Sequence, residues 1–258
     1  MRIERYDDGV PCWVDLMAPD ADRAVEFYSA LFGWEVGPPT PEAGGYRVAT
    51  VGDALVAGIM PLMGEEAPPA WMSYVKSDDV DATIATAKSL GAQVVVEPID
   101  VLDAGRMAVI ADPVGAVVSV WQPDQHPGAQ LVNEPGTWSW SELVTTDVEA
   151  AKEFYGALFG WEGETHGEGA GSYTDWKLGG RLVGGVMPKP PTMLAELPSY
   201  WGIYFSVADT DVAVERIQEL GGAVIRPSFD VEPGRVAVVS DPGGASFNVI
   251  TLHESLRG

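Results

Sequence analysis

A ten-residue segment that occurs twice constrains the fold of this chain more than any other feature. Residues 26–35 read EFYSALFGWE and residues 153–162 read EFYGALFGWE, so nine of the ten positions are identical. The two copies lie about half of the 258-residue chain apart. A repeat of this quality at that separation predicts that the chain contains two copies of one folding unit.

The residues around each copy predict the same order of elements. A strand over residues 11–17 precedes Asp20, whose carboxylate can cap the following helix, and Gly33 suits the end of that helix. Apolar residues at positions i, i+3, i+4 and i+7 give the helix one buried face. The second half repeats this order, with a strand over residues 138–144 and Asp147 as the cap.

Each half continues with a second set of elements. Two short strands and a Pro-rich connector lead to another strand, another capping Asp and another helix, and Asp-Pro-x-Gly precedes the last strand. We therefore predict an α+β fold of two tandem domains, each built from two paired βαβββ modules. Their curved, largely antiparallel sheet should surround a cavity on the face that the helices leave free. The predicted boundaries are residues 1–122 for the first domain, 123–136 for a polar linker and 137–258 for the second domain.

Composition excludes several classes of function. The net charge of −23 opposes binding to nucleic acid or to an anionic membrane, since both need a positive surface. The single cysteine, Cys12, rules out an internal disulfide framework and favours a reducing compartment. No apolar run has the length of a membrane span, and no signal segment is recognisable. We expect a cytoplasmic monomer or homodimer whose partner is a small organic ligand, with neither nucleic acid nor membrane as a partner.

The order of these motifs resembles a known superfamily. A strand, a capping Asp and a helix ending in Phe-Tyr-x-x-Leu-Phe-Gly-Trp are followed by a second strand–helix pair and by Asp-Pro-x-Gly with its strand. This pattern is similar to the vicinal oxygen chelate superfamily, which contains glyoxalases, bleomycin-resistance proteins and dioxygenases. The resemblance covers residues 10–252 and both halves. Within the superfamily the chain looks most like tandem actinobacterial proteins labelled as hydroxylases, lyases or glyoxalase-like antigens.

The resemblance implies where a metal would bind. Superfamily enzymes typically hold a divalent metal with a His in the first strand of a domain, a His in the fifth and a Glu in the eighth. Here none of the corresponding positions is His, Asp or Glu, and indole and thioether groups are poor ligands for such a cation. We therefore expect no metal and no cofactor. The positions hold Trp13, Met72 and Ser119 in the first half and Trp140, Gly202 and Asn248 in the second.

Other reactive side chains have structural interpretations. Cys12 falls on the helix-facing side of its strand and should be a small buried apolar residue. The three histidines are expected to be solvated: His126 in the linker, His166 in a loop and His253 near the C-terminus. Two arginines that follow glycines are expected in salt bridges: Arg106 and Arg235.

The alternation of side chains along a strand predicts which residues face each cavity. Aromatic and methionine side chains with a few polar groups dominate that face, a composition typical of a pocket for an organic ligand. The predicted ligand-binding residues are Trp13, Met72, Tyr74, Ser119, Trp121, Trp138, Trp140, Tyr204 and Asn248.

Two carboxylates occupy equivalent places on this face. Asp15 and Glu142 each follow a predicted wall tryptophan by two residues. Burial in an apolar cavity raises the pKa of a carboxyl group, so either residue could act as a catalytic acid or base. The alternative is that each accepts hydrogen bonds and orders the barrel.

Three classes of function follow from these residues. The first is a metal-free protein that sequesters a hydrophobic or aromatic molecule, resembling the bleomycin-binding branch. The second is a metal-independent enzyme of secondary or carbonyl metabolism (a lyase, isomerase or hydroxylase-like protein) that uses Asp15 or Glu142. The third is a metal-dependent glyoxalase or extradiol dioxygenase, which the residues at the six ligand positions disfavour.

Overall fold

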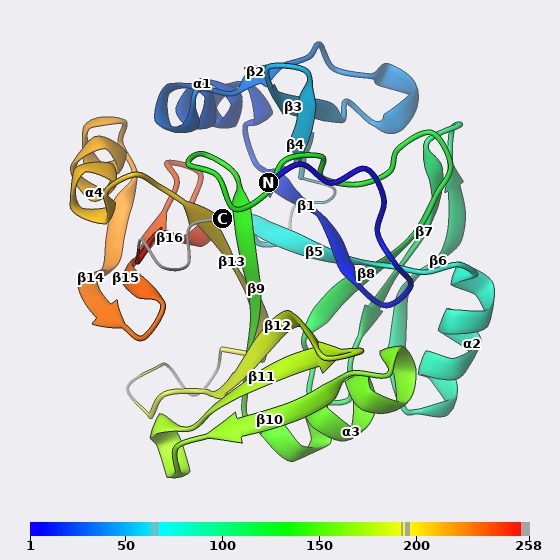
Figure 1. The fold of residues 1–258 in the computed structure, drawn as a ribbon. Helices are drawn as coiled ribbons and strands as arrows, with labels where there is room; N and C mark the ends of the chain where they lie inside the picture. Colours follow the sequence, from blue (N-terminus) through cyan, green and yellow to red (C-terminus); the bar gives the residue numbers. More distant parts are fainter. Residues whose placement is uncertain (63, 65–66, 192, 194–196, 254–258) are drawn as a thin grey trace.

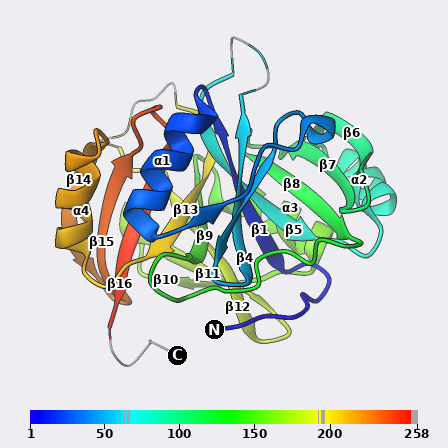
Figure 2. The same cartoon turned by 90° about the horizontal axis from the view of Figure 1, so that it is seen from above.

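The structure, a computed structural model, describes residues 1–62, 64, 67–191, 193 and 197–253, so the last five residues of the predicted second domain lie outside the described residues. The chain forms two eight-stranded sheets, each accompanied by two α-helices (Figures 1 and 2). The first half contains β1 (Pro11–Ala18), α1 (Ala21–Phe32), β2 (Glu35–Val36), a 3-10 turn (Pro41–Ala43), β3 (Arg47–Val51), β4 (Ala54–Pro61), β5 (Ala70–Lys76), α2 (Val80–Ser89), β6 (Gln93–Val101), β7 (Gly105–Ala111) and β8 (Val117–Pro123).

The second half repeats this succession of elements. It contains β9 (Trp138–Thr145), α3 (Val148–Phe159), β10 (Glu162–His166), a 3-10 turn (Gly169–Gly171), β11 (Tyr173–Leu178), β12 (Arg181–Pro188), β13 (Tyr200–Ser206), α4 (Thr210–Glu219), β14 (Ala223–Val231), β15 (Gly234–Ser240) and β16 (Ser246–Leu252). None of the helices in the described ranges is long and apolar enough to cross a membrane.

The two sheets have the same topology. The strand order is β2-β3-β4-β1-β5-β8-β7-β6 in the first and β10-β11-β12-β9-β13-β16-β15-β14 in the second. The β1/β4 and β5/β8 pairs and their counterparts are parallel, and the other neighbours are antiparallel. The predicted tandem α+β fold is confirmed. Strands β2 and β10 were not predicted, and His166 lies in β10 rather than in a loop.

Local sequence sets the helix ends. The Asp20 side chain accepts a hydrogen bond from the backbone N–H of Arg23, and Asp147 caps α3 through Ala150 in the same way. Gly33 has a φ of 73°, a left-handed conformation that glycine adopts without steric cost. The capped helices therefore begin and end where the sequence predicts.

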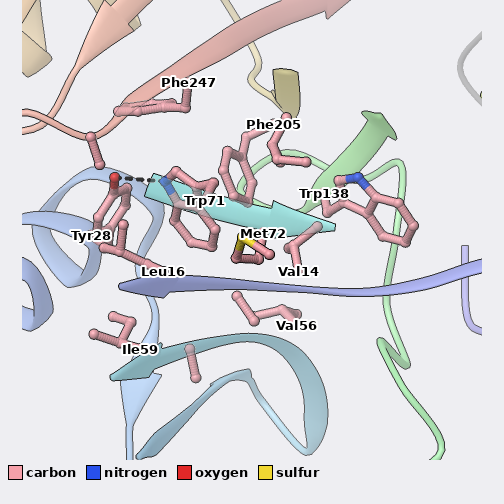
Figure 3. Close-up of a cluster of buried hydrophobic side chains, with 14 of the residues drawn as sticks. Val14, Leu16, Tyr28, Val56, Ile59, Trp71, Met72, Trp138, Phe205 and Phe247 are labelled. Carbon is pink, nitrogen blue, oxygen red and sulfur yellow. Dashed lines mark hydrogen bonds between the residues drawn. The ribbon is translucent and has the colours of Figure 1, made fainter. Parts of the chain in front are cut away.

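The helix-covered faces of the two sheets pack against each other. Ser73 on β5 and Ser141 on β9 share a hydrogen bond of 3.0 Å across this contact. Around them the aromatic residues of the repeat form a joint core, in which the rings of Trp71 and Phe205 lie 4.9 Å apart (Figure 3). The core therefore runs between the domains, and the two site faces lie on the sides of the sheets turned away from it.

The repeated motif connects the domains by reciprocal hydrogen bonds. Tyr28 donates its hydroxyl proton to Asp241 Oδ2 at 3.1 Å, and Tyr155 donates to Asp112 Oδ2 at 2.9 Å. Each tyrosine lies in one domain and its aspartate in the other. The second carboxylate oxygen of Asp112 accepts backbone N–H groups of its own Asp-Pro-x-Gly turn. The two most recognisable sequence motifs thus stabilise one interface.

Replacing Tyr155 with phenylalanine should reduce the free energy of unfolding by roughly 1–3 kcal/mol. The change leaves a buried oxygen of Asp112 without its donor and the indole N–H of Trp201 without its acceptor. Urea unfolding followed by circular dichroism measures the loss. Tyr28→Phe, the matched change on the other side of the interface, should cost a similar amount. Unchanged midpoints in both variants would show that these bonds do not stabilise the interface.

Candidate functional site

The site face of the first domain is formed by the central strands β1, β5 and β8. Trp13 lies opposite Tyr74 and Asp15 opposite Met72 in the β1/β5 register, and Tyr74 lies beside Ser119 in the β5/β8 register. Directly opposed residues point to the same face of a sheet. The structure therefore brings together on one face Trp13, Asp15, Met72, Tyr74, Ser119 and Trp121, all of them buried.

Two hydrogen bonds fix the polar groups of this face. Tyr74 donates its hydroxyl proton to Asp15 Oδ2 at 2.7 Å, and the indole N–H of Trp13 donates to the Tyr46 hydroxyl at 2.8 Å. Tyr46 reaches the site across Gly58, where an added Cβ would lie 1.9 Å from the hydroxyl oxygen. Only glycine at position 58 therefore leaves room for this arrangement.

The second domain repeats the arrangement. Tyr204 donates to Glu142 Oε1 at 2.8 Å, and the Trp140 indole donates to the Tyr173 hydroxyl at 2.9 Å. Gly185 leaves space for Tyr173, as Gly58 does for Tyr46. On β16, the side-chain amide of Asn248 donates to the backbone carbonyl of Ile203 at 3.2 Å. Glu142, like Asp15, therefore sits among aromatic groups and accepts a hydrogen bond from a tyrosine hydroxyl.

Tyr46 and Tyr173 are site residues that were not predicted from the sequence. Both precede their glycine by the same number of residues, since 58 − 46 and 185 − 173 are both 12. Aligning the two halves around these glycines would have revealed the conserved pair of tyrosines within the chain. Neither tyrosine lies on one of the three strands from which the predicted site was built, which is why they were overlooked.

Trp138 lies on the other face of its sheet from the one predicted. The register of β9 and β13 shifts between Trp140, opposite Tyr204, and Trp138, opposite Phe205. This bulge reverses the alternation, because one extra residue turns the next side chain to the opposite face. Trp138 is buried and lies directly opposite Phe205, which packs between the domains (Figure 3), so it does not line the site face.

His126 is a second correction, because it was expected to be solvated. Its ring lies 4.4 Å from Trp13 and 5.7 Å from Trp121, both in edge-on geometry. The backbone N–H of Gly128 donates to Nδ1 at 3.1 Å, which places the proton of the neutral ring on Nε2. Burial lowers the pKa of this imidazole. The segment between β8 and β9 thus contributes a ring to the first site.

The two site faces differ in exposure. Trp13 and Tyr74 are buried in the first domain, whereas Trp140 and Tyr204 keep part of their surface exposed in the second. The carboxylates are covered in both, with Asp15 1% and Glu142 7% exposed. The second domain therefore presents an accessible aromatic surface around a covered carboxylate, and the first domain does not.

Burial sets the protonation of both carboxylates. It raises the pKa of Asp15 to about 6, with the hydroxyls of Tyr74 and Tyr46 acting in the opposite direction. Burial likewise raises the pKa of Glu142, opposed by Tyr204 and Tyr173. A carboxyl group with a raised pKa can hold or release a proton near neutral pH.

Replacing Asp15 with asparagine should change how stability depends on pH. The Asp15 pKa is 3.8 without the protein environment and about 6 in the folded protein, so the folded state retains a proton that the unfolded chain has released. Its contribution to stability is therefore complete below pH 3.8 and is lost as the pH rises through about 6, a difference of about 3 kcal/mol.

The difference in unfolding free energy between the variant and the wild type isolates this titration, because the other carboxyl groups titrate in both proteins. We expect Asp15→Asn to gain stability relative to the wild type between about pH 4 and about pH 6, and the difference to stay constant above that range. Denaturant unfolding at several pH values measures it. Parallel stability curves would contradict the raised pKa of Asp15.

The residues at the family's metal positions do not fit a divalent cation. Trp13, Met72 and Ser119 offer no carboxylate or imidazole, and the carboxylates of Asp15 and Glu142 are already held by tyrosine hydroxyls. Divalent first-row metals require several N, O⁻ or S⁻ donors around one point. Within the described ranges, no group of three or more His, Cys, Asp or Glu residues could hold such an ion.

The remaining reactive groups have structural roles. Cys12 is fully buried in the core, and burial raises the pKa of its thiol. Arg106 forms ion pairs with Asp81 and Asp100, and Arg235 forms the equivalent pairs in the second domain. The predictions for all three residues are confirmed.

This fold, with two sheets of identical order built from paired strand–helix modules, defines a tandem vicinal oxygen chelate protein. A family model described as a glyoxalase-like domain matches residues 13–121 and again residues 128–250. The chain therefore belongs to the glyoxalase-like family.

Relatives and solved structures agree with this assignment. The chain is 41% identical over 256 residues to "Putative glyoxylase CFP32" of Mycobacterium bovis, covering 96% of this chain and 97% of that one. It is 36% identical over 267 residues to "Anthracycline biosynthesis protein DnrV" of Streptomyces peucetius, with 98% and 96% covered. The Mn(II)-bound glyoxalase from Novosphingobium aromaticivorans shares the fold, with a TM-score of 0.65, 14% identity, and 97% of this chain and 86% of that chain covered.

Proposed function

We propose that this protein binds a small planar organic molecule on the site face of its second domain, without a metal ion. The observation that carries the proposal is the partly exposed pair Trp140 and Tyr204 around the covered carboxylate of Glu142. An aromatic wall buries a flat ligand and a few polar groups orient it, which is the usual composition of an organic-ligand site.

The proposed ligand class is a planar polycyclic hydroxyquinone. The hydroxyl and carbonyl groups of such a molecule match the hydrogen-bonding groups of Glu142, Tyr204 and Asn248, and its rings match the indole of Trp140. The relative from Streptomyces peucetius supports this class, because its name assigns it to anthracycline biosynthesis and anthracyclines contain a planar quinone.

A titration with 1,8-dihydroxyanthraquinone tests the proposal. The protein is first treated with a chelator and dialysed, and tryptophan quenching is followed as the probe is added. We expect saturable binding that is unchanged by chelator or by added Mn²⁺, Fe²⁺, Ni²⁺ or Zn²⁺. Binding that appears only when one of these ions is restored would overturn the metal-free site.

A second candidate function is metal-independent proton transfer at the same site. It is favoured by the environment of Glu142, since burial raises the pKa of that carboxyl while a tyrosine hydroxyl holds it in place. A group of this kind can remove a proton next to a carbonyl of a bound ligand and return it elsewhere, as a lyase or isomerase requires.

We also propose a cytoplasmic location and a small-molecule partner for this protein. A chain with one fully buried cysteine suits a reducing, cytoplasmic compartment. The net charge of −23 opposes nucleic acid as a partner, so we propose a small molecule as the partner of a monomer or homodimer.

A further inference from the structure

The site face of the first domain already holds an aromatic ring supplied by the chain itself. The His126 imidazole lies edge-on to Trp13, with ring centroids 4.4 Å apart and planes at 81°. It makes a second edge-on contact with Trp121 at 5.7 Å. Edge-to-face packing at such distances is a favoured arrangement of aromatic rings. His126 therefore packs against the indole that corresponds to Trp140 in the second domain.

Backbone hydrogen bonds hold this ring from both sides. On the N-terminal side, the backbone N–H groups of Asp124 and His126 both donate to the carbonyl of Ala104. The indole N–H of Trp121 donates to the His126 carbonyl at 3.0 Å. After the ring, the N–H of Ala129 donates to the Cys12 carbonyl at 2.8 Å. The imidazole is thus positioned by anchors on β1, on β8 and on the turn before β7.

Gly128 lies close against the backbone of β1. This residue has a φ of 103°, and an added Cβ would lie 2.5 Å from the Cys12 carbonyl oxygen. Only glycine permits both the left-handed conformation and this approach. Gly128 therefore allows the segment that connects β8 to β9 (residues 124–137, the connecting segment) to place His126 over the first site.

Polar atoms of this site are left without partners around the ring. Asp15 Oδ1, Ser119 Oγ and His126 Nε2 are buried and make no hydrogen bond within the described part of the protein. These atoms belong to the same face as Trp13 and Trp121. The imidazole thus fills the aromatic part of the site and does not satisfy its polar groups, which remain suited to the hydroxyl and carbonyl groups of a ligand.

The second domain carries no ring at the corresponding position of its sequence. Trp121 corresponds to Ile250, so the offset is 129 and His126 corresponds to Ser255. Trp140, which corresponds to the Trp13 that His126 contacts, is partly exposed.

We infer that His126 closes the first site by occupying the place of a ligand ring, so that the chain binds one planar ligand, in the second domain. This inference rests on the proposed function, because it concerns the same class of ligand. The first domain then contains a further site for the same class of planar ligand, and the connecting segment covers that site.

Counting bound probe molecules tests the inference. We expect one 1,8-dihydroxyanthraquinone per wild-type chain and two per chain in His126→Ser, which copies the residue of the second domain. His126→Phe keeps a ring and should bind one. Gln125→Ser, a change at the exposed neighbour of His126 in the same segment, is the matched surface control and should also bind one. Two probes per wild-type chain, or one per His126→Ser chain, would overturn the inference.

Tryptophan quenching by acrylamide separates this inference from the proposed function, since it needs no ligand. His126→Ser should expose Trp13 and Trp121 and raise the quenched fraction, whereas His126→Phe should match the wild type. If no variant binds the probe, the proposed function fails, and the quenching result alone decides whether His126 shields the first site. Equal quenching in all the proteins would refute the shielding. Circular dichroism confirms that each variant is folded before either measurement.

Discussion

Trp140→Ala should weaken binding of a planar hydroxyquinone by well over tenfold. The indole is the partly exposed aromatic wall of the second site, held in orientation by its bond to Tyr173. Stacking on a ring contributes about 0.5–1.5 kcal/mol beyond the burial of apolar surface, and removing the indole loses both contributions. Because each ~1.4 kcal/mol is a factor of ten in the dissociation constant, the sum exceeds one order of magnitude. Equilibrium titration measures the change.

Trp13→Ala is the matched variant in the first domain, and it should behave in the opposite way. Trp13 is 4% exposed and lies beneath His126, so its removal leaves a cavity that costs roughly 3–5 kcal/mol of stability. Affinity for the probe should stay within about twofold of the wild-type value. A tenfold change in the dissociation constant needs a change of ~1.4 kcal/mol in binding free energy, and removing Trp13 is expected to cause none. Equal losses of affinity in the two variants would show that the domains share the binding, and no loss in Trp140→Ala would mean that the wrong face of the sheet is assigned.

Glu142→Gln should leave affinity nearly unchanged and remove proton transfer. The amide has the shape of the carboxyl group and keeps an oxygen that can accept the bond from Tyr204. It cannot take up a proton, so a reaction that depends on Glu142 should slow by roughly two to four powers of ten. The reaction is followed in D₂O by NMR, as exchange of the C–H protons next to the carbonyl of a ketone-bearing anthraquinone.

Asp15→Asn provides the control for that experiment. Asp15 has an equivalent environment in the first domain, but the ring of His126 covers its site. Exchange should therefore continue at the wild-type rate in this variant. Exchange that survives in Glu142→Gln would remove the catalytic role, and a wild-type protein that binds the probe without any exchange would be a binding protein only.

Much of the fold could be predicted because it depends on local preferences that are visible in the sequence. The caps Asp20 and Asp147 begin their helices as predicted, because a short acidic side chain reaches the free N–H groups of the first turn. The alternation along β1 and β5 places Trp13, Asp15 and Met72 on one face as expected. Because the sequence repeats, each local prediction could be made once in each half, and the two predictions could be compared.

The remaining features depend on long-range contacts that single-strand patterns do not encode. Trp138 was misplaced because a bulge in β9 reverses the alternation, and a bulge needs no distinctive residue. His126 was misplaced because its position is set by anchors on strands far away in sequence. Tyr28 and Tyr155 lie on the predicted buried faces of their helices, but their bonds to the aspartates of the opposite domain could be seen only in the folded chain.

A crystal structure of the chelator-treated protein with 1,8-dihydroxyanthraquinone would show directly whether the second domain binds a planar ligand without a metal ion. We expect density for one planar ligand per chain, with its rings against Trp140 and an oxygen within hydrogen-bond distance of Glu142 or Tyr204. His126 should still be in contact with Trp13. Density for a metal ion between protein and ligand, or for a ligand in the first domain of the wild-type chain, would contradict this expectation.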